Sequence, residues 1–299
     1  QFIHIDGIAS DKSNDSVLVS MNDLNLDYVM RLINLKGISI GGLITGDLIL
    51  YSLFNEPIYL ADVFVEDLSL NQSVLGNGTI NTHWNQNLRQ LDIKGEVLRN
   101  DRSEVARLGG SFTPSLDSLD LQIDARDFPV DFLNRYFEGV ASNFNGRAQG
   151  DFRIAGPTKA LRFSGDLMVN SGQVTVDILQ TTYRFNDRVI LTPYNIALNS
   201  LTMYDEERNR ARINGNIRHD GSFDNMEYDV RILTDNLMVM NTTSQDDDFF
   251  YGKAYASGQA RIFGDFSETN IVVNGVSRPK TKCYLSMAST SSVLEGDFI

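Results

Sequence analysis

Several residue types that small secreted domains and metal-dependent enzymes depend on are scarce in this chain. Its 299 residues include one cysteine, three histidines, six prolines and one tryptophan. Because a single cysteine cannot form an internal disulfide, a disulfide-stabilised scaffold is excluded. Three histidines with no ligand-like spacing offer little for a metal site.

Long apolar runs are also missing. The most apolar uncharged window, Val189 to Tyr204, is 16 residues long and contains Pro193, Asn195 and Asn199. It is too short and too polar to cross a bilayer as a helix. The chain opens on "QFIHIDGI", which already alternates like a strand. We therefore expect a piece of a longer protein, with any membrane anchor outside it.

Basic residues are too few to balance the acidic ones. Lysine and arginine number 26 against 39 aspartates and glutamates, which gives a net charge of −13. Such a chain repels phosphate backbones, so nucleic acid is not an expected partner. Hydrophobic residues make up 42% of the chain, enough to bury a substantial core.

What the chain does contain is alternation with a period of two. In "LDLQIDA" (119–125) and "ARINGNI" (211–217), every second residue is apolar or glycine and the residues between are polar. This pattern is typical of antiparallel strands with one buried and one solvated face. Turn signals such as "GNG" (76–78) separate such segments. We count roughly fifteen to twenty strands and very little helix.

The apolar side of these strands is unusually rich in glycine and alanine. In "FNGRAQGDFRIAG" (144–156) the alternating positions include Gly146, Ala148, Gly150 and Gly156. Two interpretations fit. Small residues let a sheet bend sharply or let another group approach its backbone. Alternatively, the same glycines mark bulges around an ordinary side-chain core.

An internal repeat organises the chain. A shift of 104 positions lays residues 23–50 over 127–154 without a gap and matches Asp23 with Asp127 and Gly46 with Gly150. A further shift of 108 takes Gly150 to Gly258 and gives a looser third copy. We expect one continuous array over residues 1–299, with approximate repeats 23–126, 127–234 and 235–299, the last incomplete.

Each of the first two copies contains a short amphipathic stretch. These are "LDYVMRLI" (26–33) and "VDFLNRYF" (130–137), preceded by Asp23 and Asp127, which can cap a helix. We predict short helical segments that pack at the rim of the sheet or on its apolar face. In the third copy "TTSQDDDFF" replaces this stretch, which we interpret as a longer loop.

No catalytic constellation is present. His4, His83 and His219 are far apart, and His219 in "RHDGS" is most simply a solvated turn residue. Cys283 alternates with apolar residues in "TKCYLSM", typical of a small core side chain. Nucleophile elbows and phosphate-binding glycine loops are missing. We expect no enzymatic activity, no cofactor and no metal.

The order of elements in the second half resembles a known family. After the glycine-marked strands come "YDEERNRARINGNIRHDGSFDNMEYDVRILTDNLMVMNTT", then "FFYGKAYASGQARIFG", and finally "PKTKCYLSMASTSSVLEGDFI". From Phe144 to about Ile299 this succession is similar to the TamB family, the translocation and assembly module proteins of Gram-negative envelopes, in a Bacteroidetes-like form. Residues 1–125 match only through the repeat and the strand pattern.

The resemblance implies an AsmA-like, bridge-type lipid-transfer architecture. The expected fold is all-β: a long, mostly antiparallel curved sheet forming an open half-pipe with an apolar groove and short amphipathic helical insertions. The implied function is a lipid-transport bridge that holds phospholipid acyl chains in the periplasm between the inner and outer membranes. The expected groove lining is Phe144, Ala148, Phe152, Ile154, Leu161, Phe163, Leu167, Val169, Val174, Val176, Ile213, Ile217 and Ile262.

The same resemblance implies partners outside this chain. These are the inner membrane, through an N-terminal anchor, and an outer-membrane β-barrel protein of the TamA type, through a missing last segment. An alternative role is a periplasmic scaffold that helps outer-membrane β-barrel or autotransporter proteins to assemble, for example by pairing with an open strand edge. A parallel β-helix would need a much shorter repeat than 104 residues. An outer-membrane barrel would need a lipid-facing apolar exterior with aromatic girdles at both rims, and the short amphipathic insertions and abundant inward glycine argue against it.

Overall fold

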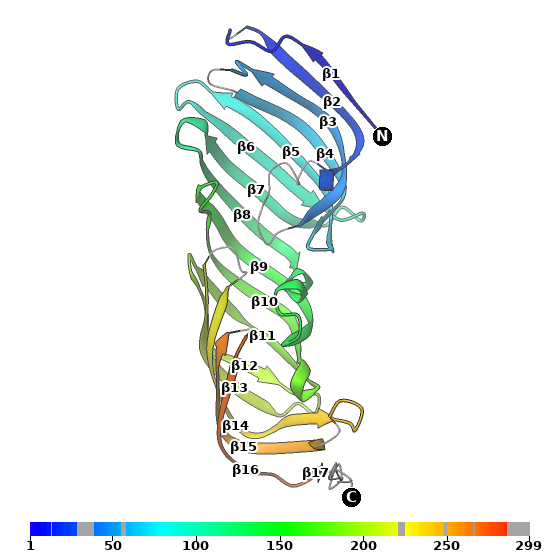
Figure 1. Cartoon of the computed structure of the whole chain (residues 1–299), viewed down its shortest axis with the longest axis vertical. Coiled ribbons are helices and arrows are strands. Elements are labelled where there is room, and N and C mark those ends of the chain that lie inside the picture. Colours follow the sequence, from blue (N-terminus) through cyan, green and yellow to red (C-terminus); the bar gives the residue numbers. More distant parts are fainter. Residues whose placement is uncertain are drawn as a thin grey trace, which may run out of the picture.

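A computed structural model shows one long, twisted and curved sheet of 17 strands (Figure 1). The structure describes residues 1–12, 14–28, 39–54, 58–220, 225–247, 250–265 and 267–285. Strands account for 74% and helices for 6%, and the sheet is not closed into a barrel. The expected all-β open, curved sheet is therefore confirmed.

The strands are β1 (Phe2–Gly7), β2 (Ser16–Asn25), β3 (Ile40–Tyr51), β4 (Ile58–Leu70), β5 (Ser73–Asn85), β6 (Gln90–Leu98), β7 (Glu104–Thr113), β8 (Ser118–Pro129), β9 (Ala141–Pro157), β10 (Arg162–Val176), β11 (Thr181–Thr192), β12 (Asn195–Tyr204), β13 (Arg210–His219), β14 (Met226–Thr242), β15 (Phe250–Asp265), β16 (Thr269–Ser277) and β17 (Lys282–Leu285). Three short 3₁₀ helices interrupt them: η1 (Pro114–Leu116), η2 (Asp131–Tyr136) and η3 (Asp177–Leu179).

The topology is a meander. Each strand from β1 to β16 pairs antiparallel with the next, and β17 continues the edge beside β15. Alternate connections therefore lie at opposite rims of the sheet (Figure 1). We call the rim that carries η2 and η3 the η2 rim, and the opposite rim, with η1 between β7 and β8, the η1 rim.

Register shifts occur on one side of the sheet. Between the middle of the strands and the η2 rim, the described pairs show β-bulges, for example at Met21–Leu24, Val65–Leu68 and Leu198–Leu201. At each of these shifts one strand advances by three residues while its partner strand advances by two. A bulge bends its strand and increases the local twist. The η2 half of the sheet is therefore more strongly bent than the η1 half.

The repeated aspartates belong to these bulges, which corrects the expected role as helix caps. Asp23 has a left-handed φ of 50° inside β2, and Asp127 lies in the register shift of β8. Asp235 occupies the equivalent shift in β14. Aspartate suits the left-handed backbone at position 23 because its short side chain can bond locally. The repeat thus preserves a strand bend.

The second amphipathic stretch is helical, as predicted, although as the 3₁₀ helix η2. It packs on the sheet: Phe137, which follows η2, lies 4.9 Å from Phe144 between ring centroids. Val130 and Leu133 pack with Ala148 in one apolar cluster. Of the first stretch, Leu26 to Tyr28 are helical, and the rest, including Val29 and Ile33, lies outside the described residues.

The repeated glycines have a common geometry. Gly46, Gly150 and Gly258 all adopt positive φ, at 141°, 135° and 141°. A Cβ added to any of them would lie 2.2–2.3 Å from a carbonyl oxygen of the next strand. Only glycine permits both the backbone conformation and this close approach. These glycines are therefore required by the strand contact, and their small volume is secondary.

This geometry predicts different effects for two glycine substitutions. Gly150→Ala should destabilise the fold by about 1–3 kcal/mol or more, because a strained φ is combined with a clash on the Asp166 carbonyl. Gly109→Ala is the control: its added Cβ meets nothing within 4 Å, and its φ is not in the left-handed region. Urea unfolding measures both, and equal midpoints would contradict this account.

Candidate functional site

A continuous apolar row crosses the sheet perpendicular to its strands. Following the paired residues from β1 to β15 gives Ile3, Met21, Gly46, Val63, Ile80, Gly95, Leu108, Ile123, Phe152, Gly165, Leu191, Ile196, Ile217, Tyr228 and Gly264. Thr269 of β16 ends the row. None of its members is charged. We call this set the apolar row and the side of the sheet that carries it the apolar face.

The opposite side of the same strands is polar. One residue away, the paired positions from β1 to β10 are His4, Ser20, Asp47, Asp62, Asn81, Lys94, Gly109, Gln122, Arg153 and Ser164. Cross-strand ion pairs recur on this polar face. Arg153 contacts both carboxylate oxygens of Asp120, at 2.8 and 2.6 Å, and Arg261 does the same to Asp229. The guanidinium of Arg153 lowers the pKa of Asp120.

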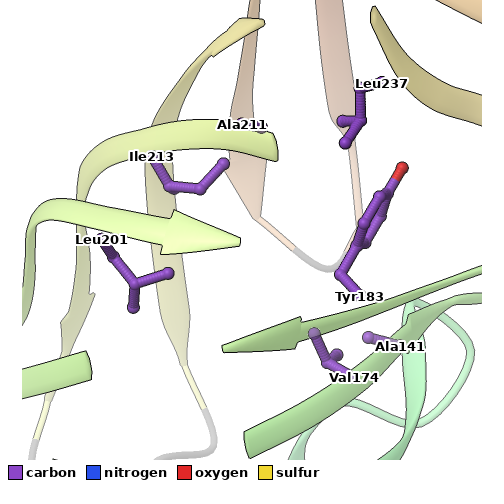
Figure 2. Close-up of a cluster of buried hydrophobic side chains, with 7 residues drawn as sticks. All are labelled: Ala141, Val174, Tyr183, Leu201, Ala211, Ile213 and Leu237. Atoms are coloured by element: carbon purple, nitrogen blue, oxygen red, sulfur yellow. The ribbon is translucent and has the colours of Figure 1, made fainter. Parts of the chain in front are cut away.

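The apolar face is the inner face of the curve. Figure 2 shows residues from β9 to β14 meeting on this side, among them Tyr183, Leu201 and Leu237. The Tyr183 hydroxyl donates a hydrogen bond of 3.0 Å to the Met238 carbonyl, although β11 and β14 are three strands apart. Side chains on a convex face would diverge rather than meet. Burial raises the pKa of Tyr183 to about 12, so the hydroxyl keeps its proton.

The predicted lining residues share this face, with Leu161 lying just before β10. They fall into two groups. Toward the η2 rim, Phe144, Ala148, Val169, Val174, Val176 and Ile213 belong to clusters in which the protein packs on itself. Toward the η1 rim, Phe152, Ile154, Ile217 and Ile262 remain partly exposed, Leu161 is also partly exposed, and Phe163 is buried against Phe152. Leu167 lies between the groups, partly exposed beside the Ala148 cluster.

The first half of the chain contributes as much to the row as the second. Ile80, Leu108 and Ile123 are row members that were not among the predicted residues. The same alternation that marked the later strands was present around them. Their alignment across the sheet could not be predicted, because it depends on the register between strands, and the pattern of a single strand does not contain that register.

Two residues lie in other environments than expected. His219 is the last residue of β13 and is 5% exposed, so it is a buried strand residue, and burial lowers its pKa. Cys283 is exposed on β17. Among the residues that the structure describes, no group of three or more His, Cys, Asp or Glu side chains could hold a metal ion.

Two shallow hollows lie on the polar face. Their volumes are about 420 and 660 Å³, and they are lined mainly by polar side chains that include Asp120, Arg153 and Asp166 in one and Lys94 and Arg107 in the other. Charged linings of this kind do not suit hydrocarbon. The apolar face is the better candidate for a functional surface.

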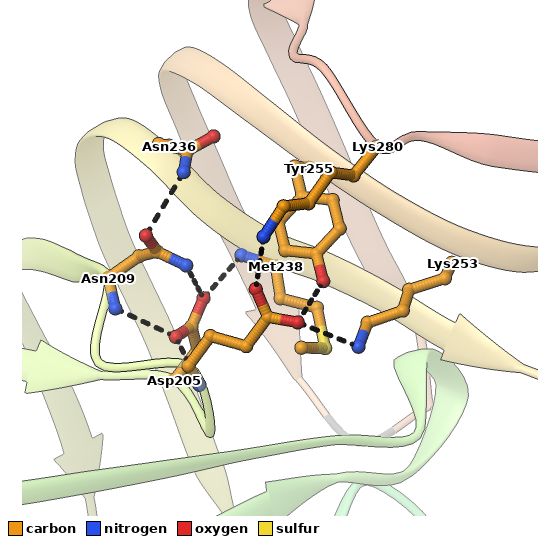
Figure 3. Close-up of polar contacts among 8 residues, drawn as sticks. Asp205, Asn209, Asn236, Met238, Lys253, Tyr255 and Lys280 are labelled. Atoms are coloured by element: carbon orange, nitrogen blue, oxygen red, sulfur yellow. Dashed lines mark hydrogen bonds and ion pairs between the residues drawn. The ribbon is translucent and has the colours of Figure 1, made fainter.

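A polar network secures the β12–β13 turn near the η2 rim (Figure 3). Asp205 is 3% exposed, and its carboxylate accepts hydrogen bonds from the backbone N–H groups of Met238, Glu207 and Asn209. The Met238 N–H is available because β14 is bulged there. This carboxylate replaces a strand partner and satisfies a buried donor.

Glu207 extends the same network to the next strand. It accepts hydrogen bonds from the Tyr255 hydroxyl at 2.5 Å and the Lys253 ammonium at 3.0 Å, and Lys280 lies 3.5 Å away. These donors lower the pKa of Glu207 to about 2. The turn is thereby tied across β14 to β15.

Comparisons with protein-family models, with curated proteins and with solved structures find no match for this chain. Among the described residues, no helix is long and apolar enough to cross a membrane. A function for this chain is therefore inferred from the fold and from the chemistry of its two faces.

The Asp205 network predicts a local stability effect. Asp205→Ala should cost about 1–3 kcal/mol, because it leaves the buried Met238 N–H without an acceptor. Glu206→Ala, an exposed change one residue away, should stay within about 0.5 kcal/mol. Chemical denaturation of both variants tests this, and an Asp205→Ala midpoint equal to that of Glu206→Ala would refute the assigned role.

The Glu207 contacts predict a pH effect. Because the folded state lowers the pKa of Glu207, its stabilising contribution is present above the unfolded pKa, near 4.5, and is lost as the pH falls toward 2. The difference in unfolding midpoint between the wild type and Glu207→Gln should therefore be largest at pH 5 and above and shrink below pH 4. A difference that stays constant from pH 7 to pH 2.5 would contradict this assignment.

Proposed function

We propose that this chain is part of an envelope lipid-transport bridge, which holds phospholipid acyl chains on its apolar face in the periplasm between inner and outer membranes. The observation that carries the proposal is the apolar row. It stays uncharged over fifteen consecutive strands, from β1 to β15, while the paired positions one residue away on the other face are polar or glycine from β1 to β10. Side chains that only form a core do not need to line up from strand to strand over such a distance.

The chemistry of the row favours hydrocarbon over polypeptide. An extended peptide lying on this face would bury N–H and C=O groups, and each unsatisfied group costs about 1–3 kcal/mol. From β1 to β15 the row offers apolar side chains and glycine, and the hydroxyl of Tyr228 already donates to the Asp265 carbonyl at 3.0 Å. Acyl chains need no hydrogen-bond partners. Each methylene removed from water contributes about 0.8 kcal/mol to the free energy of binding.

The length of the row favours a path rather than a single binding site. At about 4.8 Å per strand, fourteen intervals between β1 and β15 span about 67 Å. The hydrocarbon core of a bilayer is about 30 Å thick across two leaflets. The row is therefore long enough for several lipids in succession, with their headgroups in water. In this proposal a concentration difference drives the lipids along the row, and no chemical reaction is needed. The resemblance to TamB supports a Gram-negative envelope and the membrane partners named above.

One observation favours the alternative role as an assembly scaffold. In the described structure, β16 is an edge strand, and Ile271, Val272, Val273 and Val276 are exposed on its two faces. An exposed apolar edge can pair with a strand of another protein. The two roles differ in cargo, so they are separable by analysing what the purified protein carries.

Lipid extraction gives the first test. Protein purified without detergent should yield phospholipid in stoichiometric amounts by mass spectrometry of the organic extract. Recovery of a β-barrel polypeptide with no lipid would favour the scaffold role and reject the lipid bridge.

A pair of substitutions gives the second. Ile123→Arg places a charge in the middle of the apolar row, where hydrocarbon would have to pass an ion at a cost of several kcal/mol. We expect phospholipid transfer between vesicles to fall at least tenfold. Because Ile123 is partly exposed, the charge can reach water when the face is empty, and circular dichroism should remain that of the wild type.

The matched control is the preceding residue. Gln122 is exposed on the polar face, so Gln122→Arg introduces the same side chain on the other side of the same strand. It should transfer lipid at the wild-type rate. Equal loss or equal tolerance in the two folded variants would mean that the row is not the path.

A further inference from the structure

The two halves of the apolar face differ in how much space they leave. Three of the four clusters of buried apolar side chains lie between the middle of the strands and the η2 rim. The fourth, around Val65, also includes the row members Met21 and Val63. On β13, Ile213 is 4% exposed and packs with Leu201, whereas Ile217, four residues on and on the same face, is partly exposed. A single strand thus shows both environments with the same residue type.

The protein's own chain fills the η2 half. The segment around η2 places Val130 and Leu133 over Ala148 and Val169, and Phe137 against Phe144. The cluster between β9 and β14 has the same effect further along the sheet (Figure 2). Because protein interiors pack at crystal-like density, a filled half leaves no room for an acyl chain.

A hydrogen-bonded brace closes the same half between β11 and β14. The backbone of Met238 is held on both sides: its N–H donates to Asp205 at 2.8 Å and its carbonyl accepts from Tyr183 at 3.0 Å. Thr181 in turn donates to the Tyr183 hydroxyl at 3.1 Å. All four residues are buried. Opening this half would break hydrogen bonds that water cannot replace inside the cluster.

The η1 half is different. From β9 to β14 its row members Phe152, Ile196, Ile217 and Tyr228 keep part of their surface exposed, although Leu91, Phe163 and Met226 nearer the rim are buried. The described register shifts lie on the other side of the row, so this half keeps regular alternation. The turns at the η1 rim expose further large apolar side chains, namely Ile8, Phe54, Leu88, Leu116 and Tyr194.

We propose that acyl chains occupy only the η1 half of the apolar face, in a track that follows the partly exposed members of the apolar row and the adjacent positions toward the η1 rim, with headgroups emerging over that rim. The η2 half is a fixed support and takes no lipid. This inference rests on the proposed function, since it assigns a position to the lipid that the proposal requires. It narrows the path from the whole groove to one side of it.

Photo-crosslinking of the unmodified protein tests this assignment. The probe is a phosphatidylethanolamine with a diazirine near the middle of one acyl chain, delivered from vesicles and activated by light. Peptide fragmentation by mass spectrometry then locates the adducts. Because no residue is changed, a misfolded variant cannot confuse the result. Ile213 and Ile217 form the matched comparison within one peptide.

The expected result is adducts on Phe152, Ile154, Ile217 and Tyr228, and at least tenfold fewer on Tyr183, Leu201, Ile213 and Leu237. Similar adduct yields in the two groups would overturn the half-face track while leaving the lipid bridge intact. An organic extract of the same vesicle-incubated protein, made before illumination, distinguishes the other failure. If that extract contains no phospholipid, the proposed function falls, and the track with it.

Discussion

The placement of β-bulges on one side of a continuous meander is the constraint on which the other features depend. A sheet without bulges would twist evenly, and its apolar side chains would be equally exposed from rim to rim. Here the shifts at Met21–Leu24, Val65–Leu68 and Thr234–Leu237 all lie between the apolar row and the η2 rim. Because each bulge bends its strand, this half curls inward and packs on itself. The other half stays regular and open.

Electrostatics keeps the two faces distinct. On the polar face the register sets Asp151 opposite both Asp124 and Asp166, and like charges directly opposite destabilise a sheet. Arginines offset this: Arg188 contacts Asp166, and Arg126 contacts Asp124 at 2.5 Å. Exposed pairs of this kind contribute little stability individually. They do keep the outer face wet and charged, so that an apolar ligand has one surface to bind.

The difference between the two faces suits the sheet to an apolar ligand. A two-chain lipid cannot leave a membrane without exposing many methylenes, each worth about 0.8 kcal/mol. In the proposed bridge, an uncharged row would lower that barrier at every step, and no residue would need to react. The buried polar groups, Asp205 and Tyr183, fix the β12–β13 turn and brace β11 against β14. They shape the path from a distance and do not touch it.

The sequence by itself determined the strand content, the mostly antiparallel sheet, the repeat and the side on which each strand is apolar. Alternation with a period of two shows which residues share a face, as in 119–125 and 211–217, without any tertiary information. It also placed the amphipathic stretch at 130–137, now seen as η2 on the apolar face.

Only the tertiary structure decided the register and the curvature. Asp127 looked like a helix cap because an aspartate before an apolar stretch fits either role, and the bulge that it occupies exists only when β8 pairs with β9. Val169 and Ile154 follow the same pattern, yet Val169 is covered by the η2 segment and Ile154 remains partly exposed. Their difference arises from contacts between residues far apart in the chain, which local alternation does not record.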